Sequence, residues 1–129
     1  QNNQFGIFSI NGSYVEIKEN NINLNNIGIS AYSGDNLVLK NNLMTDNQLS
    51  GITLGNTNQS IIEGNNVKGS GIGLFLDQPS NNNQINYNNL MYNSVDIQNA
   101  NGLAINLNNN EYYQNRCIIS EPTGLCLHS

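Results

Sequence analysis

Two aspartates, Asp77 and Asp96, are the residues of this chain that could form a catalytic carboxylate pair. A glycosidase needs two carboxyl groups at a fixed separation, one of which acts as an acid and the other as a base or nucleophile. Asp77, however, precedes Gln78 and Pro79, a sequence typical of a turn that begins at the aspartate. Asp96 is expected to be solvated. We therefore interpret both aspartates as structural and predict no catalytic residue in this chain.

Basic residues are too few and too scattered to form a site for an acidic ligand. The chain has nine acidic residues and a net charge of −5, and its basic residues are only Lys18, Lys40, Lys68 and Arg116. Nucleic-acid affinity depends on Lys and Arg that neutralise phosphates, and the same charges attract anionic membranes. No apolar run approaches the ~20 residues of a membrane-spanning helix. We predict no nucleic-acid partner and no membrane insertion.

Potential metal ligands are present but are not grouped in the sequence. Asp35, Asp46, Glu63 and Asp77 could supply oxygen ligands to calcium, but they form no Asp-rich motif. Zinc usually takes four ligands, and two cysteines with the lone His128 fall short of that number. The sequence therefore predicts no metal site and no cofactor.

Two short motifs recur along the chain and indicate the elements that position these residues. In the first motif, an aliphatic residue is followed by two variable positions, an asparagine, one variable position and a second aliphatic. It occurs at Ile17–Ile22, Val38–Leu43, Ile62–Val67 and Ile85–Leu90, with a weaker copy that begins at Ile105. The second places an isoleucine after a glycine, at Gly6, Gly28, Gly51 and Gly71. Both motifs keep intervals of 20 to 24 residues. This common period indicates a solenoid in which each repeat forms one coil.

Short strands are the expected elements of each coil. Around the glycines the aliphatic residues alternate, as in Ile72, Leu74 and Leu76, which is the period of a β-strand. We expect three short strands in each coil, and no stretch has helical spacing with a cap at each end. A chain of 129 residues is one domain's worth of material. Because it opens on Gln1 and enters a repeat at once, we expect its N-terminal end to be covered by further coils or by another subunit.

The asparagines of the first motif are expected to form a ladder. Asparagine is one of the few non-glycine residues that readily adopt the left-handed conformation of a sharp bend. Coils stack about 4.8 Å apart, so that equivalent asparagines would lie above one another and their amides would hydrogen-bond along the solenoid. The predicted ladder is Asn20, Asn41, Asn65, Asn88 and Asn108.

The corner motif together with the Gly-Ile strand resembles the right-handed parallel β-helix repeat of the pectin-lyase-like superfamily, over roughly residues 5 to 110. This resemblance implies an all-β, right-handed, single-stranded parallel β-helix of about five coils, in residues 1–110. The superfamily includes lyases, hydrolases, epimerases, NosD-like proteins, phage tailspikes and adhesins, so that it leaves the activity open. Its polygalacturonase-like hydrolases share Asn-Thr-Asp, Asp-Asp, Gly-His-Gly and Arg-Ile-Lys motifs, and none of these occurs here.

Residues 111–129 depart from the repeat and are expected to form a cap on the last coil, because an open apolar end invites aggregation. The run from Asn115 to Cys126 is similar to the ending of many bacterial β-helix repeat proteins, which implies a disulfide between Cys117 and Cys126. Such a bridge implies an oxidising compartment, which would make the protein secreted, cell-surface or periplasmic.

Ligands of the superfamily usually lie on the outward face of the strand that carries Gly-Ile in this chain. Counting alternate positions places two rows on that face, namely Ser30, Thr53, Gly73 and Asp96, and beside it Tyr32, Gly55, Phe75 and Gln98. Aromatic side chains among small polar groups are a suitable platform for a sugar ring. The predicted ligand is a polysaccharide, and the predicted binding residues are Tyr32, Thr53, Phe75, Asp96 and Gln98.

From these observations we expect a non-catalytic, extracellular module that binds or presents carbohydrate as part of a larger protein. Two alternatives stay open. The chain could be the C-terminal portion of a polysaccharide lyase, glycoside hydrolase or epimerase, or it could be a structural stalk or adhesin. Basic clusters and long loops in further coils would favour the enzyme, and plain repetitive coils would favour the stalk.

Overall fold

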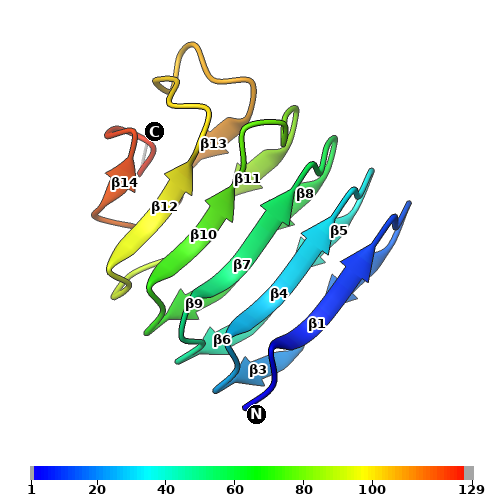
Figure 1. Cartoon of the computed structure of the whole chain (residues 1–129). Coiled ribbons are helices and arrows are strands. Elements are labelled where there is room, and N and C mark those ends of the chain that lie inside the picture. Colours follow the sequence, from blue (N-terminus) through cyan, green and yellow to red (C-terminus); the bar gives the residue numbers. More distant parts are fainter. Residues whose placement is uncertain (1, 127–129) are drawn as a thin grey trace.

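Three parallel sheets run along the molecule and enclose one apolar core (Figure 1). The computed structural model describes residues 2–126. Within that range the chain winds through about five coils that contain fourteen strands and no helix. The predicted all-β parallel solenoid is therefore confirmed.

The longest strands form a six-stranded sheet, called here the first sheet. Its parallel strands follow one another along the solenoid in the order β1 (Phe5–Ile10), β4 (Ile27–Tyr32), β7 (Ser50–Gly55), β10 (Ile72–Leu76), β12 (Val95–Asn99) and β14 (Ser120–Glu121). Each of these strands belongs to a different coil. One outward face of the molecule is therefore built from equivalent positions of successive coils.

Shorter strands complete the coils. The second sheet consists of β2 (Glu16–Lys18), β5 (Val38–Lys40), β8 (Ile61–Glu63), β11 (Gln84–Asn86) and β13 (Glu111–Tyr113). The third consists of β3 (Asn21–Asn23), β6 (Leu43–Thr45) and β9 (Asn66–Lys68), and single bridges continue it through Asn89 to Arg116. On a short fourth side, single bridges join Ser13, Asp35 and Asn58. A complete coil thus has the three predicted strands and one additional side.

Stacked aliphatic side chains fill the interior. In the first sheet the register aligns Ile7, Ile29, Ile52, Leu74 and Ile97. In the second it aligns Ile17, Leu39, Ile62, Ile85 and Tyr112. Most of these side chains are buried, and burial of each large aliphatic stabilises the fold by about 1.5–3 kcal/mol relative to exposure.

Residues with positive φ make the corners of every coil. At the corner between the second and third sheets they are Glu19, Asn41, Gly64, Tyr87 and Gln114. Each immediately precedes an asparagine whose side chain points inward. The expectation that the ladder asparagine itself adopts the left-handed conformation is therefore wrong, because the left-handed residue turns the chain and the next residue enters the interior. This conformation costs a non-glycine residue roughly 1–2 kcal/mol. The stacking of coils nevertheless imposes the left-handed conformation on residue types as different as glutamate and tyrosine.

The asparagine ladder exists but runs through two positions that differ from the prediction. Its members are Asn20, Asn42, Asn65, Asn88 and Asn115. At each step the side-chain amide of one asparagine donates to the Oδ1 of the next, at 2.9–3.0 Å. Asn41 is the left-handed residue one place before Asn42. Asn108 lies in a longer connection that increases the interval between the last two members to 27 residues from 22 or 23.

Glycines on β4, β7 and β10 allow the coils to approach closely. A methyl group on Gly28 would lie 2.6 Å from the carbonyl oxygen of Gly51, and one on Gly73 would lie 2.6 Å from that of Asp96. Asp96 takes the equivalent place on β12. Its carboxylate accepts hydrogen bonds from the backbone amides of Ile118 and Ile119, in the connection that leads to β14. The aspartate thus fastens the last coil at the position where the other coils have glycine.

The C-terminal segment adds a strand to each of two sheets and one side chain to the core. Strands β13 and β14 lie within the segment expected to form the cap, and they pair with β11 and β12. Cys117 and Cys126 form a disulfide with an S–S distance of 2.01 Å, which confirms the predicted pairing. Leu125 is fully buried in the core. His128 lies outside the described residues.

Candidate functional site

A row of aromatic and polar side chains runs across the outward face of the first sheet, and within it Ser30 is buried, at 7% exposed. The register aligns Phe8, Ser30, Thr53, Phe75 and Gln98 across five strands. This row and the neighbouring Tyr32 are called here the platform. Phe8 and Phe75 are three strands apart, which corresponds to roughly 14 Å at about 4.8 Å per strand. Three of the five predicted binding residues, Thr53, Phe75 and Gln98, therefore belong to one row. The prediction places Thr53 in one row and Phe75 and Gln98 in the next, because it aligns Gly71 with Gly51. The register instead aligns Gly73 with Gly51, which moves Phe75 beside Thr53.

Phe8 was not among the predicted binding residues, although a simple signal identifies it. Every member of the row follows the glycine of its strand, or Asp96, by two positions. The ring of Phe8 is 49% exposed and stacks on Phe5, with ring centroids 4.7 Å apart. This stacking holds the Phe8 ring at the start of the row.

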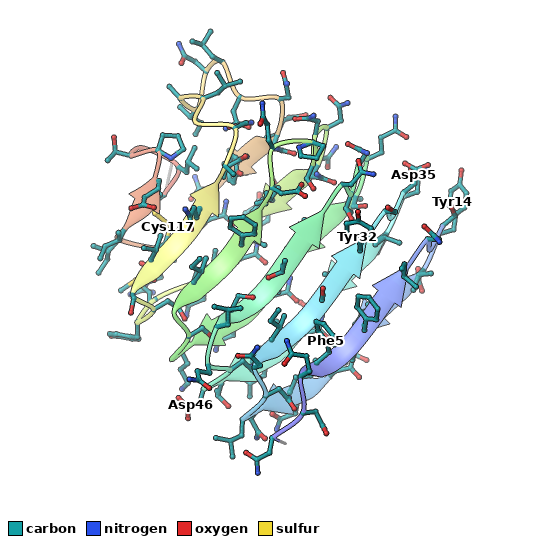
Figure 2. The ribbon with its side chains drawn as sticks, viewed as in Figure 1. Phe5, Tyr14, Tyr32, Asp35, Asp46 and Cys117 are labelled. Atoms are coloured by element: carbon teal, nitrogen blue, oxygen red, sulfur yellow. A yellow bond between two sulfur atoms is a disulfide. The ribbon has the colours of Figure 1, made fainter. Side chains whose placement is uncertain are left out.

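Tyr32 lies at the end of β4, in the row next to the five aligned residues (Figure 2). Its register neighbour is Gly55, and a methyl group at Gly55 would meet the Tyr32 ring at 2.8 Å. The glycine therefore leaves room for the ring to lie across the neighbouring strand. Tyr32 is 50% exposed, so that its ring is accessible to a ligand.

A shallow hollow of about 270 Å³ lies at the start of the same face. Its walls are largely apolar and are formed by Ile27, Leu49, Ser50, Thr53, Ile72 and Phe75. The hydroxyl groups of Ser50 and Thr53 hydrogen-bond to each other. The hollow thus combines an aromatic ring, aliphatic walls and a hydroxyl pair.

Asp96 does not reach this face. Only 2% of its surface is exposed, and its other carboxylate oxygen accepts from the backbone amide and the side-chain amide of Asn93. The expectation of a solvated Asp96 is wrong because its side chain lies at the glycine position of the strand, toward the next coil. Its hydrogen bonds hold the turn before β12 and the connection to β14, so that it is not part of the exposed platform.

Asp77 also has a structural role. Both of its carboxylate oxygens accept from the backbone amide of Asn56, and Ser80 donates its hydroxyl to one of them at 2.7 Å. These bonds tie the turn after β10 to the preceding coil. Both aspartates thus accept hydrogen bonds from backbone amides, and the structure does not present Asp77 and Asp96 as a pair that faces a common ligand.

Two ion pairs lie on the second sheet, away from the platform. Lys40 pairs with Glu63 at 3.5 Å, and Lys18 pairs with Glu16 at 3.3 Å, all on exposed or half-exposed side chains. Among residues 2–126, no group of three or more His, Cys, Asp or Glu side chains could hold a metal ion. No helix in that range could cross a membrane.

One buried ionisable group lies inside the solenoid near the last coil. Burial raises the pKa of the Tyr112 phenol above its ordinary value, although the hydrogen bond with Asn99, at 2.7 Å, opposes this shift. The phenol therefore stays protonated at neutral pH, and its oxygen accepts the hydrogen bond that the Asn99 side-chain amide donates within the core. This residue contributes to stability and does not face the platform.

Comparison of the sequence with known proteins gives one result that bears on these observations. Residues 1–127 match the family model described as a right handed beta helix region. The comparisons with curated proteins and with solved structures gave no match. The family match covers nearly the whole chain and agrees with the solenoid that the structure describes.

Proposed function

The chain belongs to the right-handed β-helix family, and from this premise we propose that it is a non-catalytic, carbohydrate-binding module of a larger extracellular protein. The observation that carries the proposal is the row from Phe8 to Gln98, flanked by Tyr32, on the outward face of the first sheet. Aromatic faces can contact the apolar faces of sugar rings, and the half-exposed Thr53 and Gln98 can hydrogen-bond hydroxyl groups.

The shape of this face favours an extended ligand. The row follows the solenoid axis, so that a chain molecule laid along it would contact Phe8, Thr53, Phe75 and Gln98 on four coils and Tyr32 beside the buried Ser30 on the remaining one. The connections that follow β1, β4 and β7 are short, and the hollow described on this face is shallow, which suits binding to an accessible polysaccharide better than the enclosure of a reacting bond. The disulfide is compatible with an oxidising, extracellular location.

The edge formed by the first coil favours a place in a longer assembly, as in a stalk or adhesin. Strands β1, β2 and β3 are the end strands of the three sheets. Among the described residues, no group donates to the side-chain oxygen of Asn20, whereas the equivalent oxygen of Asn42 accepts two hydrogen bonds. Further coils, of this chain or of another subunit, would supply the missing donor. Such an assembly is compatible with carbohydrate binding on the first sheet.

A glycan array followed by calorimetric titration tests the proposed binding. The array should include neutral and uronate-containing polysaccharides, and each should also be assayed for turnover. We expect binding without turnover, and a loss of affinity of at least tenfold in the double variant Tyr32→Ala, Phe75→Ala. The matched control is Tyr92→Asn, because Tyr92 is 77% exposed, lies outside the first sheet and has the positive φ that asparagine tolerates.

Each outcome of this experiment has a definite meaning. Equal affinity in the wild type and the double variant would refute the platform. Turnover of any polysaccharide would favour the enzymatic alternative. The absence of binding across the array would leave the stalk or adhesin as the better interpretation of the chain.

A further inference from the structure

The long connection of the fifth coil builds a second hollow, on a different side of the solenoid from the platform. The hollow measures about 450 Å³ and lies between this connection and the outward face of β11 and β13. Its exposed or half-exposed walls are Gln84, Asn86, Ile105, Asn108, Glu111 and Tyr113. A volume of this size is within the range of pockets that bind small molecules, roughly 300–1,000 Å³.

The connection between β12 and β13 is held in a defined shape. Ile105 packs against the apolar core from the side of this connection. The Asn108 side chain donates to the backbone oxygen of Leu103 at 2.8 Å and exchanges hydrogen bonds with Asn101. Its oxygen also accepts from the backbone amide of Asn110, directly before β13. This wall of the hollow is therefore fixed before any ligand binds, which lowers the entropy lost on binding.

The polar groups that face the hollow are not used by the fold. Most asparagines of this chain hydrogen-bond within or between coils, yet among residues 2–126 the side chains of Gln84, Asn86, Glu111 and Tyr113 form no hydrogen bond and no ion pair with one another or with other groups. Gln84 is aligned with Glu111, and Asn86 with Tyr113, across the parallel pair β11 and β13. One amide thus lies one strand spacing from a carboxylate, and the other lies one strand spacing from a phenol.

The Tyr113 ring is oriented by a second tyrosine. Tyr87 contacts it edge to face, with ring centroids 5.5 Å apart and an interplanar angle of 89°. Such pairs are worth about 0.5–1.5 kcal/mol beyond the area they bury, so that the contact limits the rotation of the ring. Tyr113 nevertheless remains 47% exposed. An aromatic ring is therefore held in place beside unused hydrogen-bonding groups.

We infer that this hollow, called here the coil-five hollow, binds a neutral saccharide unit. An aromatic ring can contact the apolar face of a sugar, a carboxylate accepts hydrogen bonds from its hydroxyl groups, and amides both donate and accept. An anionic ligand is disfavoured because Glu111 is the charged side chain of the hollow. The inference does not depend on the platform of the first sheet, which lies on another face and has other residues.

Nuclear magnetic resonance titration of the full chain tests the inference. The probes are methyl glycosides of the common neutral hexoses, pentoses and N-acetylhexosamines, with N-acetylarginine amide as a cationic probe. We expect at least one glycoside to shift the side-chain amide signals of Gln84, Asn86 and Asn108 in a saturable manner. Tyr113→Ala and Glu111→Gln should each weaken that binding at least tenfold.

Two further variants separate this site from the platform. The double variant Tyr32→Ala, Phe75→Ala should leave binding at the coil-five hollow unchanged, and Tyr92→Asn should leave both sites unchanged. Because the Glu111 side chain is exposed and has no hydrogen-bond or ion-pair partner among the described residues, Glu111→Gln keeps the test valid even if Tyr113→Ala perturbs folding. No saturable shift with any glycoside, binding unaffected by both variants, or binding of the cationic probe alone would each overturn the inference.

Discussion

Removal of one rung of the asparagine ladder should destabilise the protein far more than removal of an identical neighbour. Asn65 is 1% exposed, and its oxygen accepts hydrogen bonds from the backbone amide and from the side-chain amide of Asn42. Its own amide donates to the backbone oxygen of Leu39 and to the side chain of Asn88. The substitution Asn65→Ala therefore removes four hydrogen bonds at once.

The magnitude follows from the groups that are left without a partner. Asn42 loses the acceptor of its backbone N–H and of one side-chain N–H, and each buried donor without an acceptor costs about 1–3 kcal/mol. We expect a loss of about 3–5 kcal/mol, since two buried donors lose their acceptor and the space left by the side chain relaxes only in part. At 0.05–0.15 kcal/mol per residue, a protein of this length has a total stability of roughly 6–19 kcal/mol. One rung therefore accounts for a substantial share.

Urea denaturation followed by circular dichroism measures this loss, with the disulfide kept oxidised. For a slope of about 2 kcal/mol/M, the midpoint of Asn65→Ala should fall by roughly 2 M. The matched control is Asn66→Ala, because Asn66 is exposed and its side chain forms no hydrogen bond with residues 2–126. Its midpoint should change by less than the equivalent of about 0.5 kcal/mol. Similar losses in the two variants, or a loss below about 1 kcal/mol for Asn65→Ala, would refute the argument.

Three other predictions concern the packing of the coils. Gly51→Ala should lower the free energy of unfolding by about 1–3 kcal/mol, because a methyl group there collides with the Val67 side chain. A methyl group at Gly102 would have nothing within 4 Å, so Gly102→Ala should cost only the roughly 1 kcal/mol that a non-glycine residue loses in the left-handed conformation. Asp96→Ala should remove the acceptor of two backbone amides before β14, so that hydrogen exchange at residues 118 and 119 becomes faster. Burial raises the pKa of the Tyr112 phenol in the folded state. The stability that the protonated phenol contributes is therefore fully present below the unfolded pKa of about 10 and is lost as the pH rises above it. The variant Tyr112→Phe should reduce this loss.

Each of these predictions has a result that contradicts it. If Gly51→Ala and Gly102→Ala were equally stable in denaturant titrations, close approach of the coils would not explain Gly51. Unchanged exchange at residues 118 and 119 would mean that Asp96 does not hold the last coil. Identical loss of stability between about pH 9 and pH 11 in the wild type and in Tyr112→Phe would assign the alkaline transition to other groups.

Sequence periodicity was sufficient to predict the solenoid because the inward aliphatic residues keep one register in every coil. It was insufficient for the ladder at Asn41, where two adjacent asparagines satisfy the motif. There the aliphatics Leu39 and Met44 occupy the core positions, and only Asn42 has the correct spacing to both. A shift of one residue exchanges an exposed corner for a buried rung, and composition alone does not distinguish the two.

The fifth coil was harder to predict because its core residues change type. Tyr112 and Cys117 take the places that aliphatics take in the other coils, around Asn115, and the longer connection moves this corner out of the period. Asp96 was misplaced for a related reason, since its position is equivalent to that of Gly73 and not to the outward row. The predicted residues Thr53, Phe75 and Gln98 were nevertheless brought together, because alternation within a strand is a local property. Carbohydrate binding by these residues stays a prediction.

The stacking of coils also determines how the protein would respond to mechanical load. Hydrogen bonds between neighbouring strands point along the solenoid axis, so that a force between the two ends of the molecule would open them one row at a time instead of shearing many together. Each coil that peels away releases 22 or 23 residues, which is about 75–80 Å of extended chain. The disulfide and the Asp96 contacts reinforce the last coil, so that unwinding would start at the first. A filament that contained this module would lengthen in steps and keep its C-terminal attachment intact until last.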